Sequence, residues 1–97
     1  MEEFNIPSRV LRDIIRFARA HSVDKVLLFG SRARGTNGER SDIDIAVYGG
    51  DFDAFYDDIK EKTHSLLMFD VVNADGKISE ELEREIAREG IMIYEKT

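Results

Sequence analysis

The spacing of hydrophobic residues changes several times along the chain, and each spacing predicts a type of secondary structure. In some segments the apolar residues recur every three or four positions, which predicts helices with one buried face. Other segments are short apolar runs or alternate apolar with polar residues, which predicts strands. The expected helices run from Pro7 to about His21, from Phe52 to Leu66 and between Ser79 and Gly90, and the expected strands cover 26–29, 43–47, 67–72 and 91–94. This order predicts an α/β (α+β) fold in which helices pack against one mixed, four-stranded β-sheet.

Local signals mark several helix ends. Pro7 suits the first turn of the first helix, where its missing N–H costs no hydrogen bond. Ser79 is expected to cap the third helix and Gly90 to end it. We interpret the glutamates of that helix as a solvated face. No repeat, low-complexity stretch or flexible linker divides the chain, so we expect a single domain over residues 1–97.

The composition is typical of a soluble globular protein, with 42% hydrophobic and 35% charged residues. The net charge of −6 argues against non-specific binding to nucleic acid or to an anionic membrane, because both require a basic surface. The absence of cysteine excludes disulfides and thiolate metal sites. No apolar run approaches the roughly 18 residues of a membrane span, and the start Met1-Glu2-Glu3 is unlike a signal peptide. We therefore expect a cytoplasmic protein that binds neither membrane nor nucleic acid.

Three aspartates form the first candidate site. Asp42 and Asp44 are two residues apart on an expected strand, so both side chains leave the same face, roughly 6.6 Å apart at the backbone. Their like charges repel unless a cation lies between them, and hard carboxylate oxygens suit Mg²⁺ or Mn²⁺. Asp70 interrupts the apolar run 67–72, where a buried carboxylate is costly unless it is paired or ligated. If the two strands are neighbours, three carboxylates converge and can hold two metal ions.

Each of these patterns also has a simpler interpretation. An Asp-X-Asp pair in a small acidic protein is most often part of the solvated surface. A single aspartate in an apolar run also occurs in edge strands, where it discourages aggregation. The aspartates alone therefore do not establish a site, and the segment before them decides between the interpretations.

The run Gly-Ser-Arg-Ala-Arg-Gly, residues 30–35, directly follows an expected strand and is a candidate phosphate-binding turn. Gly30 permits a sharp turn at the strand end, and Ser31 then stands at a helix or turn N-terminus, where N–H groups and a hydroxyl can bind phosphate. Arg32 and Arg34 add planar donors that match phosphate oxygens. Taken alone, the run is equally compatible with an ordinary surface loop.

Together, the turn and the Asp-X-Asp pair form a more specific pattern. The stretch from Gly30 to Val47, with Ser-Asp-Ile-Asp-Ile-Ala-Val at its end, closely resembles the active-site motif of polymerase-β-type nucleotidyltransferases. More narrowly, it resembles the minimal nucleotidyltransferases that are encoded beside HEPN-domain partners in prokaryotic toxin–antitoxin pairs. The resemblance covers nearly the full chain, and Asp70 stands where the family has its third carboxylate. Ile45 replaces a frequent leucine, which has no chemical consequence.

The resemblance implies a role for each motif residue. The residues expected to hold two Mg²⁺ ions (or Mn²⁺) and to form the catalytic centre are Asp42, Asp44 and Asp70. Of these, Asp70 is expected to help deprotonate the attacking hydroxyl. The residues expected to bind the phosphates of ATP are Gly30, Ser31, Arg32 and Arg34.

The implied function is the transfer of AMP from ATP to a tyrosine of a HEPN ribonuclease toxin, which silences the toxin. The chain would then be an antitoxin. Larger relatives add a helical domain that grips the substrate, so a partner protein or a second copy is expected to complete the pocket of this short chain. The main alternative is a non-catalytic antitoxin that neutralises the toxin by direct contact. A third interpretation is an α/β domain in which the motifs are coincidental.

Overall fold

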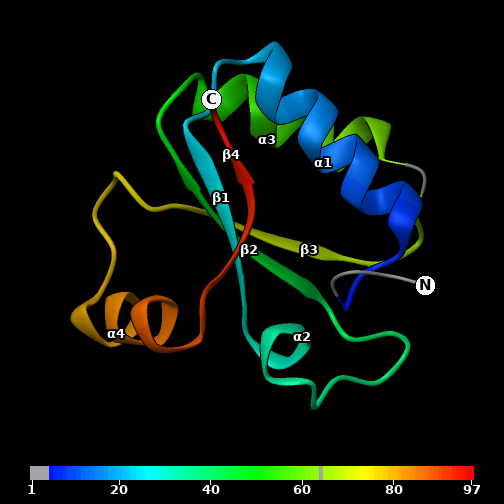
Figure 1. Cartoon of the computed structure of the whole chain (residues 1–97), viewed down its shortest axis with the longest axis vertical. Helices are drawn as coiled ribbons and strands as arrows, with labels where there is room; N and C mark the ends of the chain where they lie inside the picture. The colour runs from blue at the N-terminus through cyan, green and yellow to red at the C-terminus, as the bar shows by residue number, and fades with distance from the viewer. Residues whose placement is uncertain (1–4, 64) are drawn as a thin grey trace.

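The computed structural model describes residues 5–63 and 65–97, so the acidic start Met1–Glu3 lies outside the described part. Its helices and strands follow one another in the predicted order, with one added helical turn, α2 (Figure 1). The elements are α1 (Ser8–Ala20), β1 (Lys25–Phe29), α2 (Ser31–Arg34), β2 (Ile43–Tyr48), α3 (Phe52–Lys62), β3 (Phe69–Asn73), α4 (Glu80–Glu89) and β4 (Ile91–Glu95). Among the described helices, none is long and apolar enough to cross a membrane.

The sheet is mixed, as the sequence predicts. In the described residues it has four strands in the order β3-β2-β1-β4. β1 pairs antiparallel with β2 and with β4, whereas β2 pairs parallel with β3. A parallel neighbour requires a crossover, and α3 supplies it between β2 and β3 (Figure 1). This crossover brings residues near position 70 beside residues near position 44.

Helices cover both faces of the sheet. α1 and α3 lie together on one side, and α4 lies on the other (Figure 1). Along β2, Ile43 and Ile45 belong to the core under α1 and α3, while Ala46 packs with Ile86 of α4 in a smaller core. Because side chains alternate along a strand, Asp44 shares the α4 side with Ala46. The fold thus places Asp44 on the less covered face of the sheet.

The two largest boundary errors both lie between α3 and β3. α3 ends at Lys62, where the hydroxyl of Thr63 donates to the carbonyl of Ile59 at 2.8 Å and the Thr63 backbone becomes extended. Leu66 is therefore fully exposed rather than part of the helix face. β3 begins at Phe69, two residues later than predicted, and Met68 before it is 67% exposed. The apolar spacing continues through this connection although no core is available for it.

The predicted ends of α4 are confirmed, whereas Pro7 lies just outside α1. The Ser79 hydroxyl accepts a hydrogen bond from the N–H of Leu82 at 3.1 Å and caps α4, and Gly90 follows the last residue of that helix. Pro7 lies one position earlier than expected, as the residue that precedes α1.

Candidate active site

Asp44 and Asp70 are direct neighbours across the β2–β3 pair. The parallel register places Asp44 opposite Asp70, and adjacent strands lie about 4.8 Å apart. Asp42 immediately precedes β2 and is exposed. Asp70 is also exposed, because β3 is an edge strand, so the burial cost expected for this carboxylate does not arise. The fold therefore brings Asp70 beside the Asp-X-Asp pair.

The environment of Asp44 disfavours its charge. Burial is the largest cause, followed by the negative charges of Asp70, Asp42 and Glu85, and together they raise the pKa of Asp44 to about 6. The positive charge of Arg34 lies close enough to Asp44 to oppose this rise in pKa. A carboxylate whose pKa is raised by its neighbours marks a point where negative charge is concentrated.

The donor set suits a divalent cation. Asp44 and Asp70 offer hard carboxylate oxygens, the ligands that Mg²⁺ and Mn²⁺ prefer, and a cation would offset the neighbouring negative charges that, after burial, raise the pKa of Asp44. Within residues 5–63 and 65–97, no group of three acidic or histidine side chains lies close enough together to enclose a metal ion. The carboxylates of Asp44 and Asp70 are nevertheless on paired residues, and their chemistry fits Mg²⁺. Asp42 lies two residues before Asp44.

The turn between β1 and α2 has the shape that its sequence predicts. Gly30 has a φ of +77°, which favours glycine, and a Cβ at this position would overlap the carboxylate of Asp44. The N–H groups of Ala33 and Arg34 bond to the carbonyl of Gly30 at 3.1 and 3.0 Å. No acceptor within the described residues binds the N–H groups of Ser31 and Arg32. These two donors begin α2 next to Asp44 and are available to an anion.

Arg32 differs from the prediction. Its side chain is buried, with 5% of the residue exposed, and each guanidinium nitrogen donates to a backbone carbonyl. The acceptors are Ser41 at 3.1 Å, Asn5 at 2.9 Å and Glu39 at 3.1 Å. In this arrangement Arg32 holds the loop before β2 against the N-terminal segment, rather than presenting its guanidinium to a phosphate. The sequence shows the charge of Arg32, but the carbonyls that bind it come from separate segments.

Arg34 is exposed and pairs with α4. Its Nη1 atom donates to both carboxylate oxygens of Glu89, at 2.9 and 3.0 Å, and lies 3.7 Å from Glu85. Sequence reasoning missed Glu89, because the glutamates of α4 were all interpreted as solvated. Its position directly before Gly90, where α4 turns back to the sheet, is the signal that distinguishes it.

Known proteins are similar to this chain in sequence and in fold. The family model for polymerase β nucleotidyltransferases matches residues 12–97. A crystal structure of a toxin–antitoxin with AMP-PNP shares 26% identity, with a TM-score of 0.68, over 90% of this chain and 74% of that chain. A mutant of the toxin–antitoxin MntA–HpeT shares the fold at 24% identity, with a TM-score of 0.67, over 90% and 74% of the two chains. No curated protein sequence matches the chain.

The contacts of Arg32 predict a structural cost for replacing it. Arg32→Lys should lower the free energy of unfolding by about 2 kcal/mol, because one ammonium cannot reach three separate carbonyls. Arg40→Lys changes an exposed arginine of the same loop and should shift it by less than about 0.5 kcal/mol. Urea unfolding followed by circular dichroism measures both. Equal stability of Arg32→Lys and the wild type would show that these bonds do not hold the loop.

The pKa of Asp44 predicts a pH-dependent stability. Folding raises this pKa from 3.8 to about 6, so the folded state binds the proton more tightly than the unfolded chain does. The wild type therefore loses stability from this group as pH rises between these values, and the loss is complete above about 6. Asp44→Asn removes this titration. In metal-free buffer, the free energy of unfolding of the variant should therefore rise relative to that of the wild type as pH increases from 3.8 to about 6. Chemical unfolding at several pH values checks this, and parallel profiles would contradict it.

Proposed function

This chain belongs to the polymerase β nucleotidyltransferase family, and on that premise we propose that it transfers AMP from ATP to a hydroxyl group of a partner protein. The observation that carries the proposal is the placement of Asp44 opposite Asp70, directly against the Gly30 turn. Metal-binding carboxylates beside free N–H donors are what the transfer of a nucleotidyl group requires.

The proposed acceptor is a tyrosine of a HEPN ribonuclease toxin, and its modification in the cytoplasm silences the toxin. The chain then acts as an antitoxin. Support comes from the similar solved structure, which is a toxin–antitoxin crystallised with AMP-PNP, an analogue of ATP. The exposed position of Asp70 on an edge strand leaves room for a large acceptor to approach.

The triphosphate of ATP binds at the start of α2 in this proposal. The free N–H groups of Ser31 and Arg32 and the Ser31 hydroxyl bind phosphate oxygens, and Arg34 adds a positive charge. The negative charge near Asp44 would repel the nucleotide, so binding depends on a cation at the carboxylates.

The residues that would hold two Mg²⁺ ions, or Mn²⁺, are Asp42, Asp44 and Asp70. When bound, Mg²⁺ supplies charge neutralisation at the phosphates and acidifies the acceptor hydroxyl. The acceptor oxygen forms a bond to the α-phosphorus, the bond between the α-phosphorus and the bridging oxygen breaks, and pyrophosphate leaves. Asp70 accepts the proton of the hydroxyl, which its exposed position on the edge strand permits.

Neutralisation of the toxin by contact alone is the second candidate. Leu66 and Met68 project large apolar side chains into solvent on the segment that leads into β3. Exposed apolar side chains of this kind are common at protein–protein contacts. In this alternative the partner covers that segment, and the nucleotide site is not needed for protection.

The proposed activity predicts a large effect of the paired carboxylates. Replacing Asp42 and Asp44 together by alanine should lower the transfer of labelled AMP to the neighbouring gene's product at least about a hundredfold, because no cation then neutralises the phosphates. Asp57→Ala, which removes an exposed carboxylate from α3, is the control and should transfer at the wild-type rate. Undiminished transfer by the double variant would contradict the proposal.

Protection of cells separates the two candidate functions. A variant with Asp42, Asp44 and Asp70 all replaced by alanine should fail to rescue cells that express the toxin, if modification is what silences it. The Asp57→Ala protein should rescue them as the wild type does. Full rescue by the triple variant, at equal expression, would instead establish neutralisation by contact.

A further inference from the structure

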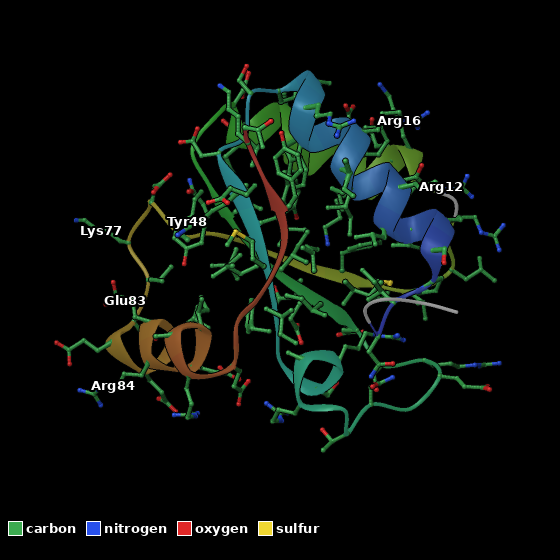
Figure 2. All side chains as sticks on the ribbon, viewed as in Figure 1. Arg12, Arg16, Tyr48, Lys77, Glu83 and Arg84 are labelled. Carbon is green, nitrogen blue, oxygen red and sulfur yellow. The ribbon has the colours of Figure 1, made fainter. Side chains whose placement is uncertain are left out.

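Glu89 behaves unlike the other glutamates of α4. Its side chain is 11% exposed, whereas Glu80 is 86% exposed on the same helix. Glu83 and Arg84 extend outward from α4, as Figure 2 shows. The carboxylate of Glu89 instead faces the turn between β1 and α2. A charged group in such a position is costly unless its partners compensate for the lost water.

The Glu89 carboxylate binds Gly30, just before α2, and Arg34, the last residue of α2. The N–H of Gly30 donates to Oε1 at 3.3 Å, and Nη1 of Arg34 donates to both oxygens at 2.9 and 3.0 Å. Burial acts to raise the pKa of Glu89, but the hydrogen bond and charge of Arg34 and the Gly30 N–H lower it overall. A single carboxylate thus links the strand end, the short helix α2 and the end of α4.

The contacts of Glu89 leave the proposed phosphate donors open. All contacts between Arg34 and the glutamates use Nη1, so in the described structure Nη2 and Nε of Arg34 have no acceptor. The N–H groups of Ser31 and Arg32 are likewise unbound by any described residue. An arginine held by one nitrogen can still offer the others to a phosphate. Glu89 therefore holds Gly30 and Arg34 while these donors stay unoccupied.

We propose that Glu89 is a positioning residue for the triphosphate: its carboxylate holds the Gly30 amide and the Arg34 guanidinium in the arrangement that receives the phosphates. This inference rests on the proposed function, since it assumes that ATP binds at this turn. In this role, α4 stabilises the conformation of the turn through Glu89. The effect is on nucleotide binding rather than on the chemical step.

A neutral replacement of Glu89 tests this role. Glu89→Gln keeps an oxygen for the Gly30 N–H but removes the charge that holds Arg34. Partners that orient the ligands of a bound metal ion typically contribute 10- to 100-fold, and by the same reasoning the KM for ATP and the Kd of Mg²⁺–AMP-PNP should rise about tenfold. The value of kcat should stay within about twofold, because Glu89 touches no reacting atom. Glu89→Asp retains the charge and should recover part of the affinity.

The matched control is Glu80→Gln, which removes an exposed glutamate from the same helix and should leave both constants unchanged. Calorimetric titration with Mg²⁺–AMP-PNP, at a temperature where each variant is folded, separates the outcomes. Unchanged or tighter binding by Glu89→Gln would overturn the inference alone. A wild-type protein that does not bind Mg²⁺–AMP-PNP, either alone or together with the neighbouring gene's product, would overturn the proposed function, and this inference with it.

A second measurement needs only the wild type and covers the case in which Glu89→Gln does not fold. Amide hydrogen exchange of Gly30 reports its bond to Glu89. If Glu89 positions the turn, the Gly30 amide should stay protected, or become better protected, when Mg²⁺–AMP-PNP is added. Faster exchange on addition of the nucleotide would show that the carboxylate is displaced, and it would overturn the proposal.

Discussion

The parallel pairing of β2 with β3 holds two carboxylates of like charge beside each other. The electrostatic repulsion between them is the main constraint on the candidate site. Asp44 stands opposite Asp70, and burial together with the charges of its neighbours raises its pKa to about 6. The strands can bear the cost because Ile43 and Ile45 anchor the opposite face of β2 in the main core. A divalent cation converts such a repulsion into an attraction, which is why the carboxylates fit a metal-dependent transferase.

The turn beside these carboxylates depends on two contacts that come from opposite directions. At Gly30, the absence of a side chain lets the turn approach Asp44 closely. From the other side, Glu89 at the end of α4 binds both Gly30 and Arg34. Since Ile86 fixes α4 against the sheet, the smaller core and the turn form one unit. The packing of α4 thereby affects the groups proposed to receive the nucleotide.

The sequence pattern predicts the strands and long helices well, because each buries one face against a common sheet. It fails at Leu66, where the apolar spacing continues after Thr63 has already left the helix. It also cannot show the direction of Arg32, whose acceptors lie on the loop before β2 and on the N-terminal segment. The sequence pattern does not distinguish Glu89 either, since the burial of this side chain depends on how α4 packs against the turn. Local spacing identifies the motif, but long-range contacts decide which charged groups of the motif remain free.

The binding position of a paramagnetic cation shows whether the paired carboxylates hold a metal. Mn²⁺ added with AMP-PNP to the isotopically labelled protein broadens the NMR signals of nearby amides. The signals of Asp44, Asp70 and Ser31 should broaden first, and replacing both Asp44 and Asp70 by asparagine should abolish the effect. Broadening centred instead on the exposed glutamates of α4, with Asp44 and Asp70 unaffected, would contradict the central claim that these paired carboxylates form the metal site of a nucleotidyltransferase.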